Sequence, residues 1–317
     1  MVKPPLIIIA GPTAVGKTAI SIELAKRLNA EIISADSMQV YKDLNIGTAK
    51  ITEEEMEGIP HHLIDVIEAD EKFDVSIFKE MFDEAVTGIL SRNHVPIMVG
   101  GTGFYIQAAL YGVDFNDESQ DPEYRKELEE EIKLGNGTKL YQMLAEVDPK
   151  SAETIHPNNY VRIARALEYY HATKTPISLH NEEQRKKESR FNELFFVITD
   201  DRGKLYDRID ERVDLMVRNG LVNEVKGLLD RGLTLENTSM KGIGYRELVP
   251  IPEDAFSMFR AVEKIKQNSR HYAKRQLTWF RREENIDWIN RDEYSGNDEI
   301  VDYIYNRYKT EICSNGN

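Results

Sequence analysis

The sequence predicts an α/β fold in which a parallel-sheet core carries a mostly helical insertion. An apolar run at residues 6–10 is followed by a glycine-containing loop and then by apolar residues at helical spacing. The same order of strand, glycines and helix recurs at residues 95–110. Between residues 116 and 190 the sequence is charged and helical, without a convincing strand pattern. Strands that alternate with helices are typical of a parallel sheet, so this charged segment stands out as an insertion.

The first element expected is a strand at residues 6–10. The run LIIIA is rich in isoleucine, which is typical of a strand buried on both faces of a parallel sheet. Gly11 and Pro12 end this strand, and Ile20 and Leu24 then follow at the spacing of an amphipathic helix.

Three further strands are expected in the core. AEIISADS (30–37) indicates a second strand that ends at Asp36. VPIMVGGTGFYIQAAL (95–110) indicates a strand, a glycine turn that contains Thr102, and a helix. FFVITDD (195–201) indicates another buried strand, after which the chain is mostly helical.

The insertion is expected to consist of helices. DPEYRKELEEEI opens one helix behind a proline at a first-turn position. HPNNYVRIARALEYYHATK indicates another, with Asn158 or Asn159 as its N-cap. We therefore expect a core made of residues 1–115 and 191–317, and a helical insertion at 116–190.

Charge is unevenly distributed along the 317 residues. The net charge of −14 argues against a nucleic-acid partner when it is taken globally. Binding depends on where the charges lie, however, and one helical stretch holds a single acid, Glu263, among many basic residues. That stretch contains Arg260, Lys264, Lys266, Arg270, Lys274, Arg275, Arg281 and Arg282, interleaved with aromatic residues. It is either a solvated helix face or a surface for an anionic partner.

Cysteine content and hydropathy narrow the class of protein. The lone cysteine, Cys313, excludes a disulfide framework and a cysteine zinc site. The apolar run at the N-terminus is too short for a signal peptide, and no apolar stretch reaches the length of a membrane span. The expected location is the cytoplasm, with no membrane partner.

GPTAVGKT (11–18) matches the phosphate-binding pattern G-x-x-x-x-G-K-[ST] between a strand and a helix. Gly11 and Gly16 allow the backbone N–H groups to form a concave nest, and the helix N-terminus adds partial positive charge. Lys17 supplies a full charge, and Thr18 a hydroxyl for Mg²⁺. The pattern predicts a P-loop NTPase-like core that binds phosphate, but it does not identify the molecule that carries the phosphate.

Asp36 follows the second predicted strand, where ligands usually bind in such sheets. Its carboxylate could hold Mg²⁺, act as a general base, or cap the segment that follows. His61 and His62 suggest a metal site, but adjacent residues do not face the same way, and no cysteine is near. We favour a structural role for the two histidines.

Several motifs, in order over nearly the whole chain, resemble those of the tRNA dimethylallyltransferases, also called tRNA isopentenyltransferases. They are GPTAVGKT, ISADSMQVYKDLNIGTAK, PHHLIDV, VGGTGFY, EVDP, HPNN, RIARALE, GIGYREL and RHYAKRQLTWFRR. DSMQVYKDLNIGTAK and KRQLTWFRR are close to signatures of that family. Eukaryotic members often carry a zinc-finger extension that this chain lacks, so the resemblance is to the bacterial form.

The resemblance implies transfer of a dimethylallyl group from dimethylallyl diphosphate to N6 of the adenosine 3′ of the tRNA anticodon. Asp36 would then be the general base, Thr102 would bind near the reacting amine, and Arg212 would clamp the diphosphate. Alternatively, Arg212 pairs on the helix surface with Asp207, Asp210 or Glu211. The loop that would hold the diphosphate consists of Gly11, Pro12, Thr13, Ala14, Val15, Gly16, Lys17 and Thr18.

The resemblance also implies partners and a cofactor. The partners would be the anticodon stem-loop of tRNA and dimethylallyl diphosphate, and the cofactor Mg²⁺, for which the P-loop offers Thr18. Separately, we expect the protein to be a monomer. The residues expected to contact tRNA are Asp36, Ser37, Met38, Gln39, Thr102, Tyr124, Tyr160, Val161, Arg162, Ile163, Ala164, Arg165, Lys241, Gly244, Tyr245, Arg246, Arg275 and Arg281.

Two other functions fit the P-loop. A small-molecule or nucleotide kinase would use Lys17 for ATP and Asp36 as a metal ligand. A P-loop regulator that binds RNA would bind tRNA without modifying a base.

Overall fold

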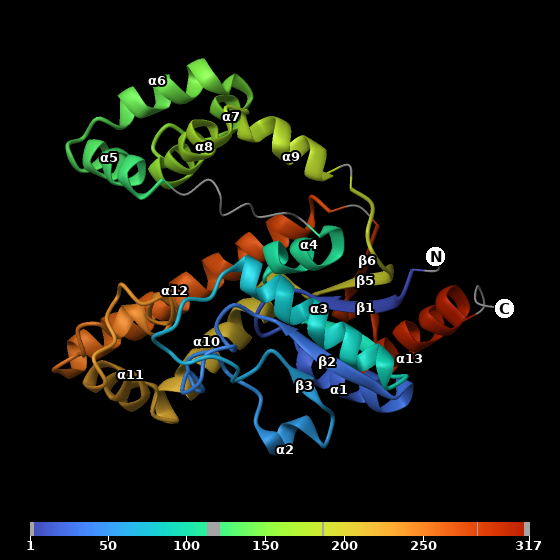
Figure 1. The fold of residues 1–317 in the computed structure, drawn as a ribbon. Coiled ribbons are helices and arrows are strands. Elements are labelled where there is room, and N and C mark those ends of the chain that lie inside the picture. Colours follow the sequence, from blue (N-terminus) through green and yellow to red (C-terminus); the bar gives the residue numbers. More distant parts are fainter. Residues whose placement is uncertain (1–2, 113–120, 186, 284, 314–317) are drawn as a thin grey trace. The chain divides into compact units, whose positions relative to one another are not determined.

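A six-stranded parallel sheet forms the centre of the larger of two structural units (Figure 1). The structure is a computed structural model that describes residues 3–112, 121–185, 187–283 and 285–313. The strand order is β3-β2-β4-β1-β5-β6, so β1 lies between β4 and β5. The strands are β1 (Pro5–Ala10), β2 (Ala30–Ala35), β3 (His61–His62), β4 (Val95–Gly100), β5 (Asn192–Thr199) and β6 (Ile286–Asn290).

Helices cover both faces of the sheet, which confirms the predicted α/β class (Figure 1). Side chains of β1 alternate: Ile7 and Ile9 pack in one core cluster, and Leu6 and Ile8 in the other. The first cluster lies under α1 (Lys17–Leu28) and α13 (Asn297–Tyr308), the second under α3 (Val75–Ser91) and α4 (Gly103–Tyr111). Burial on both faces explains why the strand sequences are continuously apolar.

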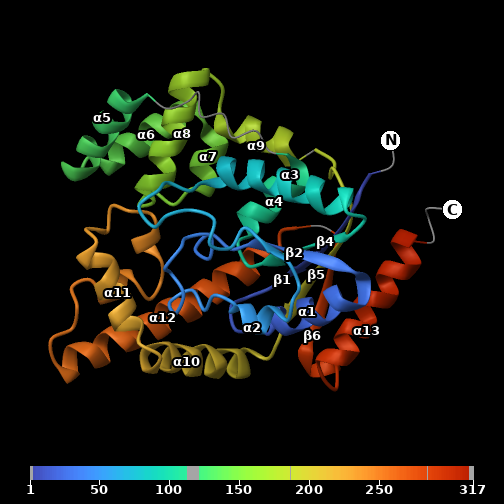
Figure 2. The ribbon, with the colours of Figure 1, turned by 60° about the horizontal axis from the view of Figure 1, so that its bottom comes forward.

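Three more helices follow β5, of which α12 packs along α10 (Figure 2). They are α10 (Arg202–Arg218), α11 (Leu221–Asp230) and α12 (Ala255–Phe280). The short elements are α2 (Glu53–Met56), η2 (Ser239–Lys241), η3 (Arg246–Leu248), η4 (Arg291–Glu293) and the π-helical η5 (Lys309–Cys313). Among the described residues, no helix has both the length and the apolar character needed to cross a membrane.

The second unit spans residues 113–188, and the first comprises 1–112 and 189–317. Within its described part, the second unit is helical with a core of its own that contains Leu128, Leu144 and Ile163. The predicted boundary between residues 115 and 116 lies outside the described residues. The helices are α5 (Pro122–Lys133), α6 (Gly137–Val147), α7 (Pro149–Thr154), α8 (Tyr160–Thr173) and α9 (Ile177–Arg185).

Capping explains where two of these helices begin. Asp121 accepts hydrogen bonds from the amides of Glu123 and Tyr124, ahead of the proline that opens α5. At α8, Asn159 accepts from the amide of Arg162, which decides between the two predicted N-caps.

Candidate functional site

The carboxyl ends of four neighbouring strands bring the predicted site residues to one edge of the sheet. The P-loop follows β1, and Asp36 follows β2 directly. Thr102 lies two residues beyond β4, and Asp200 follows β5. In parallel sheets this edge is where ligands bind, because every strand ends there and a connecting loop begins.

The P-loop turns sharply into α1. Gly11 has φ +145°, and a Cβ there would lie 2.4 Å from the carbonyl oxygen of Ile198, so only glycine fits. Lys17 Nζ donates to the carbonyls of Gly11 (2.9 Å) and Pro12 (2.8 Å). Burial, and next the charge of Arg212, lower the pKa of Lys17 to about 7. The site is therefore short of negative charge, which an anionic ligand would supply.

Two arginines outside the motif hold the same loop by its carbonyl groups. Arg208 Nε donates to the carbonyl of Ala14 (3.1 Å), and Arg291 Nη1 to that of Val15 (3.0 Å). Asp200, whose side chain is buried, accepts a hydrogen bond from Arg208. Sequence analysis gave no sign of these contacts, because Arg291 lies far along the chain on η4.

Asp36 is oriented by its own backbone turn. Its Oδ1 accepts from the amides of Met38 (2.8 Å) and Gln39 (3.3 Å), as in an Asx-turn. Its Oδ2 accepts no hydrogen bond from the described residues, so it is available to a ligand. No helix of the described chain begins directly after Asp36, so these contacts form a turn and not the helix cap foreseen as one alternative.

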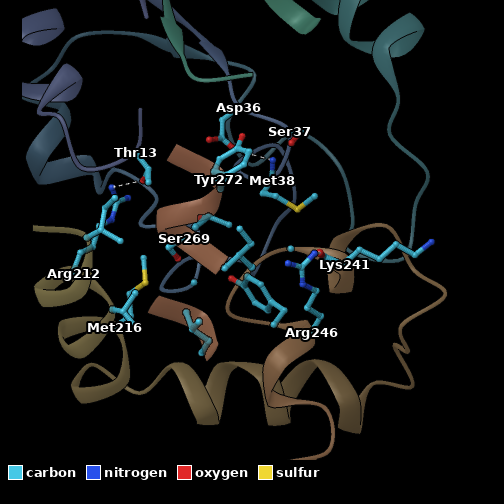
Figure 3. A pocket seen from close by; sticks show the side chains of 18 of the residues that line it. Thr13, Asp36, Ser37, Met38, Arg212, Met216, Lys241, Arg246, Ser269 and Tyr272 are labelled. Carbon is cyan, nitrogen blue, oxygen red and sulfur yellow. Dashed lines mark hydrogen bonds between the residues drawn. The ribbon is translucent and has the colours of Figure 1, made fainter. Parts of the chain in front are cut away.

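Two cavities meet at Asp36. One, of about 290 Å³, lies over the P-loop and is mainly polar, with Lys17, Thr18 and Gln39 in its wall. The other, of about 260 Å³, has mixed walls, and we call it the apolar cavity because Met38, Val213 and Met216 line it among polar and charged side chains (Figure 3). The residues common to both cavities are Thr13, Asp36, Thr48, Arg212 and Tyr272.

Arg212 extends from α10 to the P-loop, where its Nη1 donates to Thr13 Oγ1 at 3.2 Å (Figure 3). Burial lowers its pKa, and the charge of Asp36 opposes that shift. Among the described residues Arg212 forms no ion pair with Asp207, Asp210 or Glu211, and Asp210 accepts instead from Arg270 at 2.5 Å.

Two residues of α12 that sequence analysis did not assign to the site complete it. Gln276 Oε1 accepts from the amide of Thr13 (3.1 Å), and its Nε2 donates to the carbonyl of Gly101 (2.9 Å). Tyr272 lies beside Asp36, and burial together with the Asp36 charge raises its pKa to about 12 (Figure 3). Tyr272 and Gln276 are four residues apart on one helix face, a spacing that could have marked them.

Several of the residues that are expected to contact tRNA line the apolar cavity, at different places around it. Figure 3 shows Lys241 and Arg246 on the side opposite Arg212, and Ser37 and Met38 next to Asp36. Further candidates that line it are Tyr245 and Arg275, whereas Gly244 and Arg281 line neither cavity.

Thr102 lies close to Tyr272 and lines neither cavity. Its amide lies 3.3 Å from the carbonyl of Ala35, at the end of β2. Its Oγ1 is buried and makes no hydrogen bond of ordinary geometry with the described residues, but its interaction with the Tyr272 phenol opposes the rise in that phenol's pKa. The Thr102 hydroxyl is therefore near Tyr272 rather than isolated.

In the helical unit, the residues that are expected to contact tRNA differ in how exposed their side chains are. Val161, Arg162 and Arg165 are exposed. Ile163 is a correction: its side chain is 0% exposed in the core of the unit, so it is not a surface for RNA. Tyr124 stacks on the His171 ring at 3.9 Å between centroids. Tyr160 and Ala164 pack against the same core and are partly buried.

His61 and His62 form strand β3 at the edge of the sheet, and their rings make local hydrogen-bond contacts. His62 Nε2 contacts Glu31 at 2.6 Å, and His61 Nδ1 contacts the carbonyl of Ile59 at 2.8 Å. Glu31 is buried, and hydrogen bonds from Arg92, then from His62 and His94, lower its pKa to about 2 despite burial. The described part of the chain contains no cluster of three or more His, Cys, Asp or Glu side chains suited to a metal.

Part of the basic stretch on α12 is neutralised inside the fold. Lys266 pairs with Asp214 at 2.7 Å, and Arg270 pairs with Asp210. The stretch is therefore not simply a row of free cations, although Lys274, Arg275 and Arg281 are exposed.

Comparison with known proteins connects this geometry to a family. Residues 39–283 match the family model described as IPP transferase. A protein of Lachnoclostridium phytofermentans called tRNA dimethylallyltransferase is 51% identical over 94% of this chain and 95% of its own length. The crystal structure of a tRNA delta(2)-isopentenylpyrophosphate transferase of Staphylococcus epidermidis aligns with a TM-score of 0.71 at 45% identity, over 97% of this chain and 100% of that one. A eukaryotic dimethylallyltransferase described as acting on tRNA aligns with a TM-score of 0.78 at 30% identity, over 98% of this chain and 77% of that one.

Proposed function

The chain belongs to the IPP transferase family, and on that premise we propose that it transfers a dimethylallyl group from dimethylallyl diphosphate to N6 of the adenosine 3′ of the tRNA anticodon. The observation that carries the proposal is the meeting at Asp36 of a mainly polar cavity and a second cavity whose walls are partly apolar. One cavity suits a diphosphate and the other a prenyl group and a base, and the new bond would form between them.

The P-loop cavity is suited to the leaving group. When the bond from the allylic carbon to oxygen breaks, its electron pair stays on the diphosphate, and the negative charge there is the main cost of the step. The positive partners held in this place are Arg212, the amides at the start of α1, and Lys17, which a bound anion would keep protonated. They would stabilise that charge without rearranging during the reaction.

Mg²⁺ fits the oxygen groups of the polar cavity. The Thr18 hydroxyl and the Asp36 carboxylate both line it, and oxygen ligands are those that Mg²⁺ prefers. Mg²⁺ takes few protein ligands and keeps waters or phosphate oxygens for the rest, so we assign it to Thr18 together with oxygens of the diphosphate. A bound ion would add positive charge next to the leaving group.

The apolar cavity is suited to the acceptor. The N6 lone pair would form the bond to the allylic carbon, and the N6 proton would move to Oδ2 of Asp36. A positioned base commonly contributes about 10²–10⁴-fold. We assign to the Thr102 hydroxyl, which lies near Tyr272, a hydrogen bond to the reacting amine, and to Met38 apolar contact with the base.

Binding of tRNA extends beyond the cavity. We assign the exposed Arg162 and Arg165 of α8 to phosphate contacts, together with Lys241, Arg246 and Arg275 around the cavity. The adenosine must leave its stack to reach Asp36, which is easier from an anticodon loop than from a duplex. A monomer that acts in the cytoplasm is consistent with this function.

The test is direct. The purified protein is incubated with Mg²⁺, labelled dimethylallyl diphosphate and unmodified tRNA, and the tRNA is then digested to nucleosides. We expect label in N6-(dimethylallyl)adenosine, and none when the acceptor adenosine is replaced by guanosine. A tRNA that stays unlabelled, with ATP rather than dimethylallyl diphosphate raising the Tm, would instead favour a kinase.

A further inference from the structure

Glu224 of α11 accepts hydrogen bonds from the backbone of residues 45–47, in the loop that follows Asp36 in the chain. Its Oε2 accepts from the amides of Asn45 (3.0 Å) and Ile46 (2.7 Å), and its Oε1 from the amide of Gly47 (3.0 Å). Three successive N–H groups therefore converge on one carboxylate, in the manner of an anion-binding nest. The loop and the helix are about 180 residues apart in sequence, as each hydrogen bond spans 177–179 positions.

Tyr245 joins the same carboxylate. Its phenol donates to Glu224 Oε1 at 2.6 Å, and burial, then the Glu224 charge, raise its pKa well above the ordinary value. The ring also packs against the loop, because a Cβ on Gly47 would lie 2.5 Å from it. Glu224, Tyr245 and the loop thus form one packed assembly.

This assembly forms part of only one of the two cavities. Gly47 and Tyr245 line the apolar cavity, and Thr48, the next residue, lines both. None of the four residues that Glu224 contacts lines the polar cavity over the P-loop. A substitution at Glu224 would therefore displace the wall of the apolar cavity first. The P-loop beside the polar cavity is held by separate contacts from Gln276, Arg208 and Arg291.

We propose that Glu224 is a positioning residue for the acceptor adenosine. It holds the Gly47 wall of the apolar cavity against Tyr245, so that the base enters in the orientation that presents N6 to Asp36. The inference rests on the proposed function and goes beyond it by assigning a role to a side chain that lines neither cavity.

Glu224→Gln tests this role with little change in size. An amide has one acceptor oxygen in place of two, so the nest and the phenol cannot all be satisfied. We expect KM for tRNA to rise roughly tenfold or more, from the lost hydrogen bonds to a charged group. KM for dimethylallyl diphosphate should stay within about twofold, since its cavity keeps all its contacts. Glu224→Asp keeps the charge on a shorter stem and should recover part of the tRNA affinity.

Two further variants make the result specific. Glu31→Gln is the matched control, because Glu31 is also a multiply bonded carboxylate, more fully buried than Glu224, but lies near the start of β2, roughly 16 Å along the strand from Asp36. It should lower the Tm and leave both KM values unchanged. Tyr245→Phe removes one donor and should raise KM for tRNA by less than Glu224→Gln does. In the double variant the two effects should not add.

The outcomes separate the hypotheses. An unchanged KM for tRNA in Glu224→Gln, or an equal rise in both KM values, would overturn the positioning role. If Glu224→Gln does not fold, Glu224→Asp and Tyr245→Phe decide by the same split between KM values. Absence of transfer by the wild-type protein would refute the proposed function instead, and this is measured before any variant.

Discussion

Asp36→Asn isolates the proton-accepting role proposed for Asp36. Asparagine Oδ1 can still accept from the amides of Met38 and Gln39, so the turn that orients the side chain is kept. The oxygen Oδ2, which has no partner among the described residues, becomes an NH₂ group that cannot accept a proton. The substitution therefore removes the base and leaves the loop.

The expected loss follows from the contribution of a positioned base. The rate of the chemical step should fall by about 10²–10⁴-fold, which corresponds to about 3–5 kcal/mol in activation free energy. Binding of the donor should not weaken, because the substitution removes a negative charge from the cavity that holds Lys17. Asp36→Ala also removes the turn contacts, so it should lose tRNA affinity in addition.

Single-turnover transfer of labelled dimethylallyl diphosphate, with enzyme in excess over tRNA, measures the chemical step. Filter binding of tRNA and calorimetry of the donor measure the two affinities separately. A rate constant for Asp36→Asn within about threefold of wild type would refute the assignment of Asp36 as general base. A large loss of tRNA affinity in Asp36→Asn would show that the carboxylate acts in binding.

Three further changes probe other parts of the fold. Arg212→Ala should raise the Kd of dimethylallyl diphosphate about 10–100-fold, measured by calorimetry, because it removes a charged donor next to the P-loop; an unchanged Kd would contradict the clamp. Gln276→Glu should weaken donor binding at least about tenfold, since it places a carboxylate against the Gly101 carbonyl and an anionic ligand; stronger binding would argue against that geometry. In Glu31 the fall in pKa from 4.5 to about 2 stabilises the folded state by about 3 kcal/mol at neutral pH. Because the folded pKa is the lower one, this contribution is complete above pH 4.5 and shrinks as pH falls toward 2. The difference in unfolding free energy between wild type and Glu31→Gln, measured in urea, should therefore decrease to about 2 kcal/mol at pH 3.5. A difference that does not depend on pH would contradict this origin.

Sequence patterns predicted the parts of the site that depend on local structure. The P-loop and Asp36 each follow an apolar strand, and the parallel sheet then brings them to one edge. The contact between Thr13 and Gln276 spans 263 residues, and no local pattern indicates where α12 will lie relative to β1. The nest at Glu224 escaped prediction for the same reason.

Ile163 shows how a motif can mislead. The motif RIARALE places it among exposed neighbours, but Ile163, Ala166 and Leu167 form the apolar face of α8. Helical periodicity points them into the core, whereas Arg162 and Arg165 face outward. Hydrophobic spacing was the better guide at this position.

The central place of β1 has a consequence for synthesis on the ribosome. One edge of β1 pairs with β4, but the other pairs with β5, whose first residue is translated 92 positions (192 − 100) after the end of β4. At roughly 5–20 residues per second, that edge stays open for on the order of 5–20 s. Residues 113–188 are made during this interval and have a core of their own to fold around. The nascent chain thus carries an apolar, half-paired strand that needs shielding until β5 emerges.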